Sequence, residues 1–153
     1  MQKTAEAVSL GHPDKISDYI SSYILDRMIE QDSSVKYAVE VMIKNNTVVL
    51  GGEIKGNVSL SKLKQYVIQA LAEIGYTEDY AKIWQSYAIE PSKIEIINLI
   101  GCQSVDISRG VEQNGWGDQG VFVGYACQGN ENINRELFLA RKLNKALYQK
   151  ALI

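Results

Sequence analysis

Gly11-His12-Pro13-Asp14-Lys15 stands where apolar residues begin to recur at helical spacing. Proline is favoured in the first turn of a helix, because the N–H group that it lacks would have no partner there. The pattern therefore predicts a helix from this proline to about Gln31, with His12, Asp14 and Lys15 crowded at its N-terminus. The apolar stripe of this helix consists of Ile16, Tyr19, Ile20, Tyr23, Ile24 and Met28.

The start of this helix has the chemistry of an anion site. Unpaired backbone N–H groups and the positive end of the helix dipole favour a phosphate there. Lys15 adds a mobile positive charge, and Asp14 is a ligand that Mg²⁺ accepts beside phosphate oxygens. His12, the one histidine of the chain, can donate a hydrogen bond or carry a proton near neutral pH. The run fits a polyphosphate.

A purely structural role accounts for the same residues one by one. An acidic residue in the first turn stabilises a helix by about 0.3–1 kcal/mol without any ligand. Proline is common at that position, and a lysine is usually solvated. From the physics of the single residues the structural interpretation is favoured, and only the run as a whole is specific.

Composition and charge narrow the class of protein. A chain of 153 residues fits one ordinary domain, and 46% hydrophobic with 22% charged residues is typical of a globular protein. A net charge of −2 gives no electrostatic case for nucleic acid or an anionic membrane. We expect a cytoplasmic location, because no signal peptide or membrane span is visible. Cys102 and Cys127, with a single histidine, make no zinc ligand set.

Two carboxylates stand out in the middle of the chain. Residues 35–43 and 48–54 alternate as the strands of a hairpin around a turn at residues 44–47. Glu40 and Glu53 lie within these strands, and a half-buried carboxylate needs a cation or several donors. A solvent-facing position is the alternative for Glu40. Gly51-Gly52 precedes Glu53, and glycine in a strand often marks close approach of a ligand or another backbone.

The remaining segments predict an α+β fold, with helices packed on one face of a mixed or antiparallel sheet. Ser59 is expected to cap a second helix, and Gly75 is expected to end it. A glycine-punctuated loop follows the third long strand, a position where loops commonly carry function. The other expected elements are strands at residues 4–9, 93–100 and 121–126, helices at 60–74 and 133–153, and a connection at 77–92.

Four short motifs resemble the S-adenosylmethionine synthetase (methionine adenosyltransferase) family. The run from Ser9 to Lys15 resembles its opening signature, and Gly117-Asp118-Gln119-Gly120 resembles its second signature. Gly51-Gly52-Glu53-Ile54 and Gly101-Cys102-Gln103-Ser104 fall between them in the family's order. The resemblance covers the N-terminal part of a longer enzyme. It implies a synthetase-like α+β region at residues 1–130 and the start of the next domain, a helix, at residues 131–153.

The resemblance also implies a reaction and a set of roles. In this family the methionine sulfur attacks C5′ of ATP and expels triphosphate, which is then hydrolysed to phosphate and diphosphate. By resemblance, His12 and Lys15 act catalytically and bind ATP at the triphosphate, and Asp14 holds Mg²⁺ there. The glutamate that matches Glu40 helps to bind K⁺.

At the other end of the site, the resemblance implies three residues that bind the substrate L-methionine. Glu53 and Gln103 match residues that contact this substrate, and Asp118 is a candidate for its ammonium group. Active sites of the family lie between paired subunits, so the expected partners are a second copy of the chain or a complementary synthetase chain.

Two hypotheses of different classes follow. In the first, the chain is the N-terminal portion of a working synthetase, as a split subunit or a fragment, and is active only with its complement. In the second, it is a non-catalytic relative that binds nucleotide or methionine, or that pairs with a full-length synthetase. Neither hypothesis involves nucleic acid or a membrane.

Overall fold

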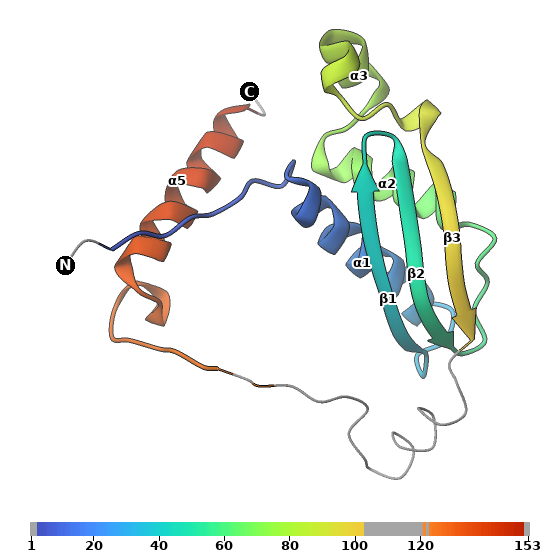
Figure 1. Cartoon of the computed structure of the whole chain (residues 1–153), viewed down its shortest axis with the longest axis horizontal. Helices are drawn as coiled ribbons and strands as arrows, with labels where there is room; N and C mark the ends of the chain where they lie inside the picture. The colour runs from blue at the N-terminus through green and yellow to red at the C-terminus, as the bar shows by residue number, and fades with distance from the viewer. Residues whose placement is uncertain (1–2, 103–120, 122, 152–153) are drawn as a thin grey trace. The chain divides into compact units, whose positions relative to one another are not determined.

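A three-stranded mixed sheet organises the computed structural model, which describes residues 3–102, 121 and 123–151. Strand β1 (Lys36–Lys44) pairs with β2 (Thr47–Lys55) in antiparallel register across a tight turn. Strand β3 (Glu95–Cys102) lies on the other side of β2 and runs parallel to it (Figure 1). The predicted hairpin and the α+β fold are both confirmed.

Two helices cover one face of this sheet. Helix α1 (Pro13–Ile29) packs against β1 and against α2 (Leu63–Ile74), as Figure 1 shows. The predicted stripe of α1 is its buried side, and the sheet contributes alternate residues from each strand. The buried core consists of Ile16, Ile20, Ile24, Met28, Val39, Ile43, Val48, Leu50, Ile54, Leu63, Val67, Ala70, Leu71, Ile74 and Ile94.

A short helix lies in the region that was predicted to be only a connection. Helix α3 (Glu78–Trp84) begins at Thr77, whose Oγ1 accepts a hydrogen bond from the Tyr80 N–H at 3.1 Å. A threonine followed by two acidic residues is a recognised start signal for a helix. Two 3₁₀ turns, η1 (Gln85–Tyr87) and η2 (Pro91–Lys93), then lead into β3.

Two helix ends differ from the prediction. Helix α1 ends at Ile29, because the Met28 carbonyl accepts from the N–H groups of Gln31 and Asp32 in a closing turn. The predicted cap at Ser59 is wrong. Its hydroxyl accepts from the Ser61 N–H at 3.3 Å, and α2 begins four residues later without a side-chain cap. Gly75 ends α2 as predicted.

Contacts along the chain separate a larger unit, Pro13–Gly117, from a smaller one made of Met1–His12 and Asp118–Ile153. The described part of the smaller unit holds the turn η3 (Asn130–Asn132) and helix α5 (Arg135–Ala151). Within this unit the Asn144 side-chain amide donates to the Val8 carbonyl at 2.7 Å. The predicted C-terminal helix is confirmed as far as it is described.

Two predicted strands are wrong. Residues 4–9 form no strand, and neither do residue 121 and residues 123–126. An extended segment becomes a strand only when a neighbouring backbone takes its hydrogen bonds. In the described part of the chain the strands that pair are β1, β2 and β3. Alternating side chains alone could not supply that partner.

The adjacent glycines of β2 differ in what the fold demands of them. Gly52 has a φ of +124°, and a Cβ at this position would overlap the carbonyl oxygen of Ala38 on β1. Gly51 has no atom within 4 Å of where its Cβ would lie. The sheet therefore requires glycine at position 52 and accepts a side chain at position 51.

This difference predicts opposite outcomes for two alanine variants. Gly52→Ala should lower the free energy of unfolding by about 1–3 kcal/mol, because the residue must leave a left-handed conformation or move β1. Gly51→Ala should change it by less than about 0.5 kcal/mol. Urea unfolding followed by circular dichroism measures both, and equal losses would contradict this account.

Asp32 ties the end of α1 to the turn after β2. Its Oδ1 accepts from the Ser34 hydroxyl at 2.6 Å and from the Ser34 N–H at 2.9 Å. Its Oδ2 accepts from the Asn57 N–H at 2.8 Å. These donors, with the Ser34 hydroxyl first, lower the pKa of Asp32 below its usual value of 3.8.

The lowered pKa sets the sign of an acid effect on stability. Ionised Asp32 stabilises the fold above pH 3.8, and this stabilisation is lost as the pH falls through the lower pKa of the folded state. Ser34→Ala removes the largest cause, so its thermal midpoint should fall less steeply below that pH than the wild-type midpoint. Ser33→Ala, at the exposed neighbouring serine, is the control and should follow the wild type. Parallel curves for wild type and Ser34→Ala would refute the assignment.

Candidate functional site

The predicted anion run lies at a true helix start. Pro13 is the first residue of α1, and Asp14 lies in its first turn. The His12 N–H donates to the Ser9 carbonyl at 3.0 Å and closes the turn that leads into the helix. Asp14 and Lys15 are exposed, and the Lys15 ammonium is 3.9 Å from Asp18 Oδ2. An ion pair this long and exposed holds the ammonium only weakly.

Glu40 and Glu53 lie on the same face of the sheet, opposite to α1 and α2. The register pairs Glu40 with Gly51 and Glu53 with Ala38, so the two carboxylates are diagonal neighbours on adjacent strands. Glu40 is exposed, as the solvent-facing alternative held, and Glu53 is half-buried. The structure thus brings together two residues that are thirteen positions apart in the chain.

This face of the sheet, called the open face here, carries large apolar side chains as well. Met42, Ile97 and Leu99 are 61%, 47% and 65% exposed. An exposed apolar patch rimmed by polar groups is typical of a binding surface. The sequence interpretation missed it, although the alternation of β3 sends Ile97 and Leu99 away from Ile96 and Ile100. The central residues of the open face are Ala38, Glu40, Met42, Val49, Gly51, Glu53, Ile97, Leu99 and Gly101.

The glycines of the open face leave space beside the carboxylates. Gly51 pairs with Leu99, and Gly101 pairs with Glu53. A Cβ at Gly101 would meet only the Gly52 carbonyl oxygen, at 4.0 Å. Since the sheet does not require glycine at either position, the space above them is available to a ligand or a partner backbone.

Gln103 and Asp118, which were predicted to contact the methionine substrate, lie outside the residues that the structure describes. Gln103 comes two positions after Gly101, the residue that is paired with Glu53.

The predicted metal ligands are single carboxylates in this chain. Among the described residues, no three His, Cys, Asp or Glu side chains gather in a way that could hold a metal ion. Mg²⁺ is often held by one or two carboxylates together with substrate phosphates, so an exposed Asp14 at an anion site fits it. Glu40 offers K⁺ one ligand group and would need others.

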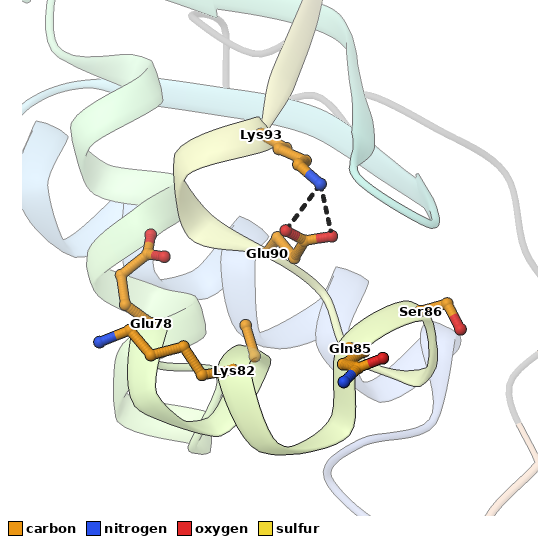
Figure 2. A pocket seen from close by; sticks show the side chains of 7 residues that line it. Glu78, Lys82, Gln85, Ser86, Glu90 and Lys93 are labelled. Atoms are coloured by element: carbon orange, nitrogen blue, oxygen red, sulfur yellow. Dashed lines mark hydrogen bonds and ion pairs between the residues drawn. The ribbon is translucent and has the colours of Figure 1, made fainter.

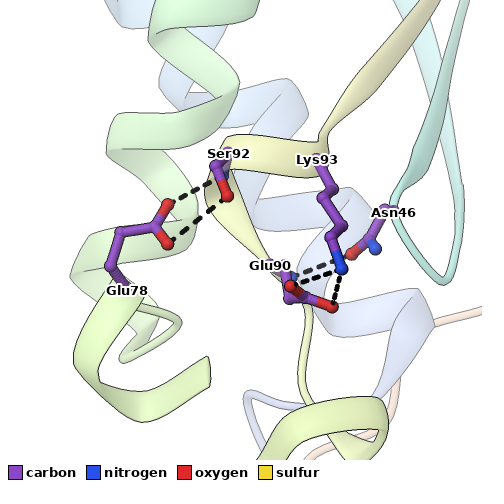
Figure 3. Close-up of polar contacts among 5 residues, drawn as sticks. All are labelled: Asn46, Glu78, Glu90, Ser92 and Lys93. Carbon is purple, nitrogen blue, oxygen red and sulfur yellow. Dashed lines mark hydrogen bonds and ion pairs between the residues drawn. The ribbon is translucent and has the colours of Figure 1, made fainter. Parts of the chain in front are cut away.

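A shallow pocket of about 440 Å³ lies between α3 and the turn η2 (Figure 2). No residue of the predicted site lines it. Glu78 accepts from the Ser92 N–H at 2.8 Å, and Glu90 pairs with Lys93 at 2.8 Å (Figure 3). The Glu90 N–H in turn donates to Asn46 Oδ1 at 2.8 Å, at the hairpin turn. These contacts hold α3, η2 and the hairpin turn together. The polar residues around the pocket therefore have a structural role.

None of the helices in the described residues is both long enough and apolar enough to cross a membrane.

Comparisons with known proteins agree with the motifs. A family model described as "S-adenosylmethionine synthetase, N-terminal domain" matches residues 1–105. The S-adenosylmethionine synthase of Borreliella afzelii is 41% identical over 139 residues, which are 85% of this chain and 33% of that relative. The enzyme of that name from Helicobacter pylori strain G27 is 36% identical over 152 residues, 96% of this chain and 38% of the relative.

A solved structure is similar over almost the whole chain. It is described as an unusual S-adenosylmethionine synthetase from Campylobacter jejuni, with a TM-score of 0.84 and 33% identity. The similarity covers 97% of this chain and 37% of that one. The chain thus spans 33–38% of the length of these relatives. It belongs to the S-adenosylmethionine synthetase family, of which it carries the N-terminal portion.

Proposed function

We propose that this chain supplies the N-terminal part of an S-adenosylmethionine synthetase active site, which joins methionine to the adenosyl group of ATP. The observation that carries the proposal is the signature Gly11–Lys15 at the true start of α1, in a chain of this family. The chain spans about a third of the length of its relatives, so it is proposed to supply one part of the site and the rest of the synthetase the other groups.

The start of α1 is proposed to bind the triphosphate of ATP. Backbone N–H groups of the first turn and the Lys15 ammonium face an anion there, and the weak pair with Asp18 leaves Lys15 able to turn toward it. His12 donates a hydrogen bond where charge develops on the leaving oxygen of C5′. Mg²⁺ between Asp14 and the phosphates would supply charge neutralisation.

The open face is proposed to contribute to the methionine end. Glu53 is half-buried beside the space above Gly101, where a carboxylate attracts an ammonium group. Gln103 and Asp118 are proposed to contact methionine as well, and Glu40 to bind K⁺. Direct displacement at carbon requires the sulfur, C5′ and leaving oxygen to be in line, so positioning is the main task of these residues.

The open face also supports a partner. Met42, Ile97 and Leu99 expose apolar surface next to the two carboxylates. We propose that a second copy of the chain or a complementary synthetase chain lies against this face. The site would then form between the two polypeptides.

The isolated chain should show little or no synthetase activity. With ATP, methionine, Mg²⁺ and K⁺, formation of S-adenosylmethionine should be at least about 100- to 1000-fold slower than with a full-length relative, since the loss of one charge-stabilising donor costs that much. Product and phosphate are assayed together with the mass of the chain in solution. Rapid turnover that Asp118→Asn abolishes would show that the chain completes a site from its own residues. Ligand binding without turnover, even with a complement, would favour the non-catalytic relative.

The phosphate role of α1 can be tested without turnover. Lys15→Ala should weaken the binding of tripolyphosphate with Mg²⁺ by about 10-fold or more, as expected for the loss of a charged hydrogen bond. Lys64→Ala, an exposed lysine on α2, is the matched control and should bind like the wild type. Isothermal titration calorimetry measures all three proteins. Equal affinities for both variants would place the phosphate elsewhere.

A further inference from the structure

Helix α1 and strand β1 are joined by two hydrogen bonds that run in opposite directions. The Ser21 hydroxyl on α1 donates to the Val39 carbonyl on β1 at 2.9 Å. The Tyr37 hydroxyl on β1 donates to the Ser21 carbonyl on α1 at 3.1 Å. We call these two contacts the α1–β1 clasp. Ser21 and Tyr37 are 16 positions apart in the chain, so the fold is what brings them together.

The α1–β1 clasp differs in kind from the other contacts that hold α1. Apolar burial keeps the helix on the sheet, but it has no preferred direction. Two other hydroxyls of the helix, those of Tyr19 and Tyr23, donate to side chains of α2 at exposed positions. A hydrogen bond requires a short distance and a nearly linear geometry, and the clasp has one bond from each element. The clasp therefore fixes where α1 lies along β1.

The clasp lies where water competes little for its polar groups. Ser21 and Tyr37 are half-buried, and Val39 is 6% exposed. A carbonyl left without a partner at such a place is costly, so the Val39 carbonyl needs the Ser21 hydroxyl. Burial raises the pKa of the Tyr37 phenol above its usual value of 10.0, so the phenol keeps the proton that it donates near neutral pH.

The clasp connects the two ends of the proposed site. Ser21 follows Asp14 by seven positions, which is two turns and about 10 Å along the same side of α1. The Val39 carbonyl belongs to the peptide group that also contains the Glu40 nitrogen. Glu40 is in turn the diagonal neighbour of Glu53. A helix thus runs from the proposed phosphate end to the hairpin that carries the two carboxylates.

We propose that Ser21 and Tyr37 are positioning residues, which set the distance between the start of α1 and the carboxylates of the open face. This inference rests on the proposed function, because it takes both ends of the site from it. In-line displacement tolerates little error in that distance, since a misplacement of about 1 Å can cost about 100-fold in rate. Neither side chain is proposed to touch a substrate, and both act through the backbone of the neighbouring element.

The test measures that distance in the full chain, with tripolyphosphate and Mn²⁺ in place of Mg²⁺ as the probe. Mn²⁺ speeds the nuclear relaxation of amide protons by an amount that falls steeply with distance. Each amide of an isotopically labelled chain therefore reports its separation from the metal. Ile16 reports from the start of α1, and Glu40 reports from β1. The same titration with Mg²⁺ gives the reference spectra.

Ser21→Ala and Tyr37→Phe should each change the ratio of the relaxation enhancements at Glu40 and Ile16 by about 2-fold or more, as expected for a helix that shifts by about 1–2 Å. The enhancement at Ile16 itself should stay as in the wild type, because the metal and this amide are on the same helix. Ser22→Ala, at the exposed neighbour on α1, is the control and should leave both enhancements unchanged. Circular dichroism checks that all variants keep their helix content.

Each other result overturns the proposal. A ratio that Ser21→Ala and Tyr37→Phe leave unchanged means that the clasp does not set the distance. An equal loss of enhancement at Ile16 and Glu40 means that the clasp serves folding alone. If the enhancement in the wild type is not centred on the first turn of α1, the phosphate role is rejected, so a failure of the proposed function is distinguished from a failure of the clasp.

Discussion

The register between β1 and β2 determines which side chains lie under the helices and which lie on the open face. Side chains alternate between the two faces of a strand, so a slip by one residue would move Val39 and Ile43 to the surface and Glu40 into the core. Gly52 helps to hold that register, because its backbone passes so close to Ala38 that only glycine fits. The position of Glu53 beside Glu40 is a consequence of the same pairing.

The features of the chain that depend on neighbours in the sequence could be predicted. The start of α1 at Pro13 and the hairpin around residues 44–47 have local signals, and the structure has both. The short helix α3 also has a local signal, which is Thr77 followed by two acidic residues. This signal could have predicted the helix.

The features that depend on distant parts of the chain could not be predicted. Residues 4–9 alternate like a strand, but a strand needs a partner that the sequence does not name. Ser59 suits a helix cap, yet its hydroxyl accepts a hydrogen bond from the Ser61 N–H, before α2 begins. The diagonal placement of Glu40 and Glu53 and the exposure of Leu99 follow from the register. The roles of Gln103 and Asp118 rest on the family motifs alone.

The connection between β2 and β3 has a consequence for the way the chain folds. The hairpin of β1 and β2 closes through a short turn, whereas β3 pairs with β2 only after α2 and α3 have been crossed. Contacts that close long loops form late, because the entropy of closure must be offset first. During synthesis, one edge of β2 therefore stays unpaired until β3 leaves the ribosome. An unpaired edge beside apolar residues is a site of aggregation, so the risk of aggregation is greatest before β3 pairs with β2.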